Sequence, residues 1–474
     1  MLMLATLVGY FALLLLLARC SGGRGDNASF FSANRQGSWP LVAFGMIAGS
    51  ISGVTFISVP GWVTATQMTY LQMCMGFIVG YFAVAFLLLP LYYRLQLTSI
   101  YAYLGNRFGR WSHRTGALFF FLSKLTGAAA RLYLACLVLQ QFIATPLGIP
   151  FPLTASAVLL LIWGYTYRDG MRSLQLTDAL QTLCLLLALG GTLAIVASQL
   201  GWSESWELIK GSSMSQIFDW EMASPRNFWR QFLSGVFIVI VMTGLDQDMM
   251  QKNLTCRTLR DAQKDMCVYG LAFLPINALF LGLGVLLVHI ADAQGLALSG
   301  DALFPGLVAS GVLGTAIVLP FTIGIVAAAF SAADGAMTAL TTSVCVDWLG
   351  MEQCSVSAVR AERQRRWVHV GVGVAFLGCV LAFRAINSTN VINAIYTMAS
   401  YTYGPLLGLY AFGQFSKRRV FDATVPAIAL LAPLLCALLD HYAPLLWGYK
   451  MGYELLMLNG ALTALGLWVF SKRK

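Results

Sequence analysis

The chain has 474 residues, of which 58% are hydrophobic and only 11% charged, and its formal net charge is +10. Soluble globular domains carry about 25% charged residues, so the composition excludes an ordinary soluble protein and indicates a membrane protein with many spans. The positive charge does not indicate a nucleic-acid partner, because Lys and Arg fall in short loops between apolar runs and form no basic face. The ten cysteines are scattered without a Cys-x-x-Cys pair, which favours small core residues over disulfides or metal ligands.

Apolar runs long enough to cross a membrane as helices recur along the whole chain. Their approximate ranges are 2–19, 40–63, 70–93, 115–144, 152–167, 177–200, 228–251, 267–290, 308–346, 366–384, 391–413, 423–440 and 452–471. An all-α polytopic membrane protein with about thirteen transmembrane helices is therefore predicted. The ninth run is too long for one simple span, so we expect a kink or a loop helix within it.

Basic residues alternate between successive loops. The stretches 94–114, 252–264 and 417–419 contain several Lys or Arg residues, whereas 62–69 and 146–152 contain none. Because Lys and Arg favour the cytoplasmic side, we expect the N-terminus outside and the C-terminus in the cytoplasm, with the chain in the plasma (inner) membrane. No Lys or Arg precedes the first run, which argues against a cleaved signal peptide. The bilayer and a small solute are then the expected partners, with no obligate protein partner evident.

The stretch from Ala43 to Gly61, AFGMIAGSISGVTFISVPG, concentrates glycine and hydroxyl residues in an apolar helix. Glycine costs about 1 kcal/mol relative to alanine inside a helix, and hydroxyl side chains offer the backbone competing hydrogen bonds. One interpretation is close helix packing through small residues. The other is a helix that breaks within the membrane and frees carbonyl groups for an ion or a solute. This stretch alone leaves both interpretations open.

Five ionisable residues within the apolar runs stand out: Arg131, Asp178, Asp246, Asp248 and Asp334. Such groups usually face a cavity or a charged partner. Arg131 could bind a solute, or it could be neutralised by Asp178 or Asp334 in a buried ion pair. Asp178 could instead cap a helix that starts beside it. Asp246 and Asp248, near the cytoplasmic end of their run, are expected to be structural or gating residues.

Asp334 has a hydroxyl neighbour on the same helix face. Ser331 and Asp334 are separated by three residues, a spacing that brings side chains together on a helix. A carboxylate and a hydroxyl, with freed carbonyl groups nearby, are the hard oxygen donors that a small cation requires. These two residues therefore predict a cation site.

The motifs AGSISGVTF, LTDALQ and AAFSAADGAMTALTTSVCVDW occur in this order, with LTSIYAYLGNRFG and TYGPLLGLY as supporting stretches. With them the chain resembles the sodium:solute symporter family over nearly its whole length. The resemblance implies a leucine-transporter-type core of ten helices in two inverted repeats, at 40–200 and 228–413. One extra helix would precede the core, within 1–20, and two would follow it, within 423–472.

The resemblance also implies a sodium ion held between the first and eighth core helices. By position, its ligands would be the carbonyl groups of Ala48, Ile51 and Ala328 and the hydroxyl of Ser331. Asp334 and Asp178 match positions that form or adjoin a further cation site in some family members. Where the family usually has a second hydroxyl, this chain has Ala332, which leaves one sodium ligand fewer.

The same resemblance places five residues at a central solute site: Ser50, Ser52, Thr55, Arg131 and Met242. Met242 falls where sugar-carrying members have an aromatic gate, which argues against a simple sugar carrier. The planar guanidinium of Arg131 is suited to binding a carboxylate through two hydrogen bonds. We therefore expect a small organic anion, such as sialic acid or another carboxylated sugar.

The predicted function is sodium-coupled symport by alternating access, and Na⁺ is the expected coupling ion. Two alternatives remain: a sodium-coupled symporter for a neutral sugar or amino acid, and an uncoupled facilitator or channel. The chain contains no His-Glu-x-x-His, Gly-x-Ser-x-Gly or P-loop motif. An enzyme or a pump driven by its own ATP hydrolysis is therefore not expected.

Overall fold

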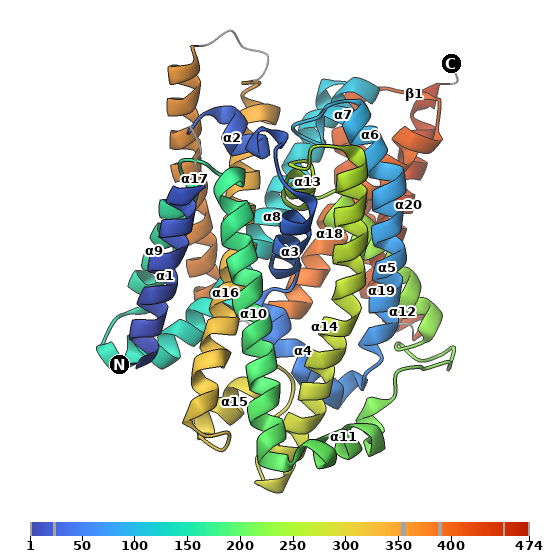
Figure 1. Ribbon diagram of the computed structural model, residues 1–474. Helices are drawn as coiled ribbons and strands as arrows, with labels where there is room; N and C mark the ends of the chain where they lie inside the picture. The colour runs from blue at the N-terminus through green and yellow to red at the C-terminus, as the bar shows by residue number, and fades with distance from the viewer. Residues whose placement is uncertain (1, 22–24, 352–356, 387–390, 449–450, 473–474) are drawn as a thin grey trace.

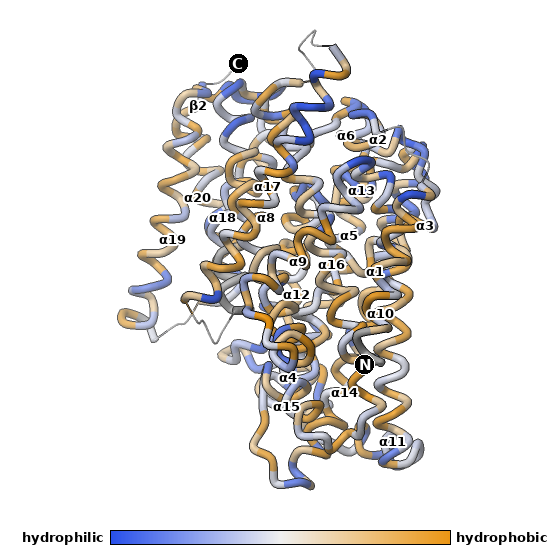
Figure 2. Tube along the Cα trace, turned by 90° about the vertical axis from the view of Figure 1, so that its left-hand side faces the viewer, coloured by the Kyte–Doolittle hydropathy of each residue, from blue (hydrophilic) through white to orange (hydrophobic). Residues whose placement is uncertain are grey.

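The computed structural model describes residues 2–21, 25–351, 357–386, 391–448 and 451–472. Almost all of this part of the chain is helical, and most of the long helices run side by side in one bundle (Figure 1). Figure 2 shows hydrophobic residues along the length of these helices and hydrophilic residues gathered at the upper end, where α2, α6 and β2 lie. The bundle therefore has the apolar flank and polar end of a membrane protein.

The helices of the first 200 residues have the following bounds. They are α1 (Leu2–Cys20), α2 (Asn27–Ser32), η1 (Ala33–Arg35), α3 (Trp39–Ser50), α4 (Gly53–Thr66), α5 (Tyr70–Ala83), η2 (Val84–Leu88), α6 (Leu89–Arg94), α7 (Ala102–Arg107), α8 (Arg110–Leu139), η3 (Gln140–Ala144), η4 (Thr145–Leu147), α9 (Phe151–Thr166) and α10 (Met171–Leu200).

The remaining chain adds further helices and one small sheet. The helices are α11 (Trp202–Gly211), η5 (Ser213–Ser215), α12 (Phe228–Val239), η6 (Ile240–Gly244), α13 (Gln247–Asn253), α14 (Leu259–Ala293), η7 (Gly300–Ala302), α15 (Leu303–Ser310), η8 (Thr315–Ile317), α16 (Val318–Ser343), η9 (Val344–Trp348), α17 (Ala358–Ile386), α18 (Val391–Phe415), η10 (Asp422–Thr424), α19 (Val425–Trp447) and α20 (Leu455–Val469). Strands β1 (Arg419–Val420) and β2 (Ser471–Lys472) pair in antiparallel fashion.

Within the described residues, seven helices are long and apolar enough to cross a membrane, and nine spans result if each of two bent pairs counts as one. The chain is thus a helical membrane protein with many spans, as predicted. The ninth apolar run, 308–346, is longer than one span because its first residues belong to the short helix α15, which ends at Ser310, while the span itself covers Thr315–Trp348.

The Gly- and Ser-rich stretch is a broken helix. Its first half, α3, ends at Ser50, its second half, α4, begins at Gly53, and the two are bent by 58°. The break, one of the two interpretations of this stretch, is therefore present. Close packing is present as well, since a Cβ added to Gly53 would lie 3.4 Å from the Ala329 side chain of α16. The stretch thus combines a break with close packing against α16.

A second broken helix lies in the other half of the chain. The segment formed by α12 and η6 ends at Gly244, α13 begins at Gln247, and the two parts are bent by 71°. Asp246 caps α13, since its carboxylate accepts hydrogen bonds from the amides of Asp248 (2.9 Å) and Met249 (3.3 Å). A carboxylate in this position satisfies free N–H groups and favours the helix dipole, which stabilises the break.

The structure corrects one expected helix boundary. α10 begins at Met171 and has Gly170 as its N-cap residue, so Asp178 lies two turns inside the helix. The interpretation of Asp178 as the cap of a helix that starts beside it is therefore wrong. Its carboxylate is buried between helices, where it requires charged or hydrogen-bonding partners.

Candidate functional site

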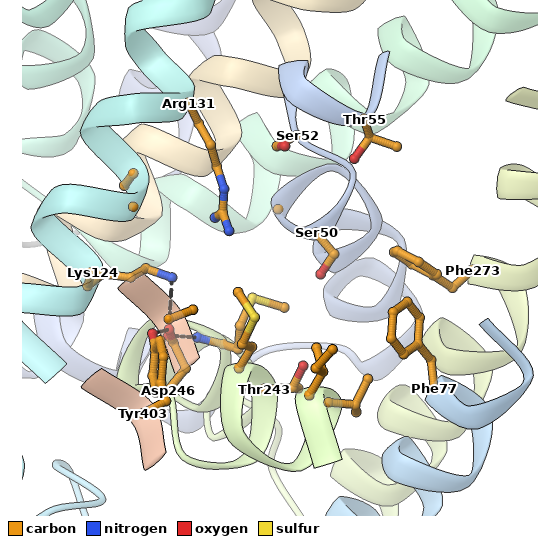
Figure 3. A pocket seen from close by; sticks show the side chains of 18 of the residues that line it. Ser50, Ser52, Thr55, Phe77, Lys124, Arg131, Thr243, Asp246, Phe273 and Tyr403 are labelled. Atoms are coloured by element: carbon orange, nitrogen blue, oxygen red, sulfur yellow. Dashed lines mark hydrogen bonds and ion pairs between the residues drawn. The ribbon is translucent and has the colours of Figure 1, made fainter. Parts of the chain in front are cut away.

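A pocket lies between the two helix breaks (Figure 3). α3 contributes Ser50 to its wall, the break contributes Ser52, and α4 contributes Thr55. Arg131 comes from α8 and Met242 from η6. The structure thus brings together all five residues that the sequence predicted for a solute site. The wall also contains aromatic side chains, including Phe77 and Phe273 in Figure 3, and a few polar groups among apolar ones are typical of small-molecule sites.

One end of the pocket is formed by a charged cluster around Lys124 of α8. The Lys124 ammonium lies 3.2 Å from both carboxylate oxygens of Asp246 and 2.8 Å from Oδ2 of Asp248. The Tyr403 hydroxyl of α18 donates a further hydrogen bond to Asp246 at 2.5 Å. This cluster joins α8, α13 and α18 at the pocket, as expected of structural or gating carboxylates. The sequence reasoning missed Lys124, although a lysine within the apolar run of α8 was a visible signal.

Arg131 lies two turns along α8 from Lys124, and its guanidinium is directed into the pocket (Figure 3). Among the residues that the structure describes, it forms no ion pair. The proposed neutralisation by Asp178 or Asp334 is therefore wrong, because both carboxylates bind other groups. A guanidinium that faces a pocket without a protein partner is suited to binding an anion.

Asp178 lies at the centre of a second polar region, where α3, α10 and α16 meet. The Ser331 hydroxyl donates to its Oδ1 at 2.8 Å, and the Lys252 ammonium of α13 lies 2.9 Å from its Oδ2. Both charged side chains are only 4% exposed. Lys252 is thus buried within the bundle, whereas the sequence placed it in a basic cytoplasmic loop, and this placement was wrong.

Asp334 has a different set of partners from its neighbour Ser331. Its carboxylate accepts hydrogen bonds from the Tyr165 hydroxyl (2.7 Å), the Gln181 amide (3.2 Å) and the Gly335 backbone N–H (2.6 Å). The two residues lie one turn apart on α16, as predicted, but they bind groups on different elements. The donors around Asp334 satisfy it within the protein.

The break in α3 frees a carbonyl group near this second region. In a regular helix the amide of Ser52 would donate to the carbonyl of Ala48, four residues earlier. Here it donates to the Ser50 carbonyl at 3.1 Å instead, so the Ala48 carbonyl loses this hydrogen bond. Ala48 and Ile51, at the end of α3, and Ala328, one turn before Ser331 on α16, are all fully buried, and α3 contacts α16. The chemistry of these donors fits a small hard cation. The Lys252 ammonium, however, lies in the same region.

A bundle of membrane helices with a polar pocket between two broken helices defines a carrier of small solutes. In agreement, residues 30–419 match the model of the sodium:solute symporter family. The chain belongs to the sodium:solute symporter family, whose members are transporters and not enzymes.

Individual relatives and a solved structure agree with this assignment. The human sodium/iodide cotransporter is 26% identical over 86% of this chain, which spans 65% of that protein, slightly less than two thirds. The sodium/sialic acid symporter SiaT of Proteus mirabilis is 24% identical over 92% of this chain and 89% of its own length. The solved structure of a substrate-bound, outward-open Na⁺-coupled sialic acid symporter has a TM-score of 0.82, 18% identity, and coverage of 100% and 99% of the two chains. At this identity the structural likeness shows the fold alone.

Proposed function

We propose that this protein is a sodium-coupled symporter that carries a small organic anion by alternating access. The observation that carries the proposal is the Arg131 guanidinium, which faces a pocket between two helix breaks without a carboxylate partner among the described residues. A half-buried cation within the membrane region is costly without a counter-ion, and an anionic solute would supply the missing charge. The anions in the names of the two relatives, iodide and sialic acid, support the same class.

The proposed solute site consists of Arg131 with Ser50, Ser52, Thr55 and Met242. Arg131 would bind a carboxylate, while the hydroxyl groups of α3 and α4 would bind polar groups of the solute. Lys124 is neutralised by Asp246 and Asp248, so it contributes little free charge to the pocket. A carboxylated sugar, with one acid group and several hydroxyl groups, matches this distribution.

The proposed sodium ligands are the carbonyl groups of Ala48, Ile51 and Ala328, the Ser331 hydroxyl, and the carboxylates of Asp178 and Asp334. When bound, sodium would supply positive charge that links α3 and α4 to α16. Ser331 would orient Asp178 through the hydrogen bond that already joins them. Asp334 would act from its own hydrogen-bonded position one turn further along α16.

The finer architecture also belongs to the proposal. The nine candidate spans, three shorter apolar helices and α18 would make thirteen spans. The two breaks occur in the first helix of 40–200 and in the first helix of 228–413, as two inverted repeats would require. One extra helix within 1–20 and two within 423–472 would flank this core. The N-terminus would lie outside the plasma (inner) membrane and the C-terminus in the cytoplasm.

Uptake into proteoliposomes tests the function directly. An inward sodium gradient, compared with choline at equal ionic strength, should drive uptake of a labelled acid from a panel of sialic acid, short monocarboxylates, neutral sugars and amino acids. We expect Arg131→Ala to weaken binding of the carried acid about 10- to 100-fold, since a hydrogen bond to a charged group contributes about 1.5–3 kcal/mol. Arg131→Lys keeps the charge but loses the planar guanidinium that can form two parallel hydrogen bonds, so its affinity for the acid should lie between those of the wild type and Arg131→Ala.

Two results would contradict the proposal. Uptake of the same size without a sodium gradient would show an uncoupled facilitator. An equal loss of neutral and acidic solutes in Arg131→Ala would show that the arginine supports the helix bundle and does not recognise a carboxylate.

A further inference from the structure

Lys252 extends from the second half of one broken helix toward the end of the other. It lies on α13, and its ammonium forms an ion pair with Asp178 of α10 at 2.9 Å. The other oxygen of the same carboxylate accepts the hydrogen bond from Ser331 of α16. One carboxylate therefore joins the lysine to the hydroxyl that is proposed as a sodium ligand.

Two glycines show how close the ammonium lies to the backbones of α3 and α16. A Cβ added to Gly49, beside Ala48, would lie 3.1 Å from Lys252 Nζ and 3.9 Å from Ser331 Oγ. A Cβ added to Gly335 would lie 2.9 Å from Lys252 Nζ. The ammonium thus occupies the space between the end of α3 and α16, where the proposed sodium ligands also lie.

The hydrogen bonds of this ammonium are incomplete. Lys252 Nζ has a carboxylate oxygen at 2.9 Å but no hydrogen bond of regular geometry within the described residues. Asp248 Oδ1 likewise has no hydrogen-bond partner there, and it lies 2.4 Å from the Cβ position of Gly335, close to the ammonium. Asp248 and Lys252 are four residues apart on α13, a spacing that allows an ion pair within the helix. A second carboxylate is therefore available to the same lysine.

We propose that Lys252 is a tethered cation that occupies the sodium site between α3 and α16 and competes with sodium for it. Sodium enters when the ammonium withdraws from Asp178 to Asp248. The inference rests on the proposed function, because it takes sodium as the competing ion. Two positive charges cannot share one buried carboxylate and its surrounding carbonyl groups without strong repulsion.

This competition has two consequences for the carrier. Only molecules in which the ammonium has left the site can bind sodium, so the apparent sodium affinity equals the intrinsic affinity multiplied by the fraction of such molecules. The ion pair between Lys252 and Asp178 also holds α13 against α10, so sodium entry would release one half of a broken helix from its neighbour. The lysine thereby couples cation binding to movement at the second break.

Sodium titration of the purified full-length protein tests the competition. Binding is measured with ²²Na⁺ and by thermal unfolding, with choline chloride keeping the ionic strength constant. We expect Lys252→Met, which keeps the length of the side chain but not its charge, to lower half-saturating sodium by about tenfold or more. Lys210→Met is the control, since it makes the same change at an exposed lysine of α11, outside both charged clusters, and its sodium titration should equal that of the wild type.

A second variant keeps the test decisive if Lys252→Met does not fold. Asp248→Asn removes the alternative carboxylate and should raise half-saturating sodium several-fold. An unchanged or weakened sodium titration in Lys252→Met, or an unchanged one in Asp248→Asn, would overturn the competition. If uptake is driven by sodium while these titrations do not move, the proposed function stands and the inference fails. If the titrations shift as expected but no solute uptake follows the sodium gradient, the inference stands and the proposed function fails.

Discussion

Two buried lysines occupy neighbouring regions of the bundle and differ in how their charge is compensated. Lys124, 8% exposed, has three carboxylate oxygens within 3.2 Å from two aspartates, at the wall of the pocket. Lys252, 4% exposed, has one carboxylate oxygen at 2.9 Å and no regular hydrogen bond within the described residues. A charge held by several partners stabilises one arrangement, whereas a charge held by one partner can move to another. We therefore expect Lys124 to keep one position and Lys252 to change its partner.

The largest expected effect follows from removing the one carboxylate that pairs with Lys252. Asp178→Asn leaves the buried ammonium of Lys252 with only Asp248, whose other oxygen is already paired with Lys124, so we expect a loss of up to about 3–5 kcal/mol. Asp246→Asn is the matched change in the other cluster, and we expect a loss of only about 1 kcal/mol because Lys124 keeps its ion pair with Asp248. Thermal unfolding of both purified variants beside the wild type measures the difference.

Equal losses in the two asparagine variants would contradict this comparison. They would show that Lys252 is compensated as fully as Lys124, either through Asp248 or through groups that the hydrogen-bond geometry does not reveal. A Lys252→Met, Asp178→Asn double variant sharpens the result. It should recover most of the stability lost in Asp178→Asn, because the unpaired charge is then gone.

A smaller effect is expected from a methyl group placed against the ammonium. In Gly335→Ala the new Cβ would lie 2.4 Å from Asp248 Oδ1 and 2.9 Å from Lys252 Nζ. The side chains must shift, and overpacking of this kind costs about 1–3 kcal/mol. Gly371→Ala in α17 is the control, since its Cβ would meet nothing within 4 Å.

The unfolding temperature should therefore be lower for Gly335→Ala than for the wild type, and unchanged or slightly raised for Gly371→Ala. Equal stability of the two variants would show that both charged side chains move freely. That result would place Lys252 outside a defined position between α3 and α16.

Much of the fold could be predicted because membrane helices are local in sequence. Long apolar runs and alternating basic loops reveal spans without knowledge of their neighbours. The break between Ser50 and Gly53 was one of two interpretations of its sequence, since glycine and hydroxyl residues weaken a helix at the position where they occur. The second break was not predicted, because the segment around Asp246 is stabilised by the carboxylate cap and by contacts to Lys124 of α8.

The candidate site could be predicted residue by residue more easily than pair by pair. The five solute residues all line one pocket, because polar groups in apolar runs must face a cavity or a partner. The charge pairs around the pocket join residues more than a hundred positions apart, as with Lys124 and Asp246. No spacing in the sequence indicates such a pair. The sequence placed Lys252 in a cytoplasmic loop for the same reason. A lysine near the end of an apolar run resembles a loop residue, and only the fold shows that α13 lies inside the bundle.

The smallest expected effect comes from restoring the hydroxyl that Ala332 lacks. Ala332→Ser adds one oxygen donor beside Ser331, and one hydrogen bond or ligand contact of this kind contributes about 0.5–1.5 kcal/mol. The serine should lower half-saturating sodium about two- to tenfold. We expect the same factor with Lys252 in place and in the Lys252→Met background, because competition by the ammonium multiplies the sodium affinity by a fraction that the serine does not change. Ala333→Ser, about 100° further around α16, controls for an added buried hydroxyl. If Ala332→Ser changes half-saturating sodium by different factors in the two backgrounds, the added hydroxyl acts on the Lys252 ammonium as well as on sodium.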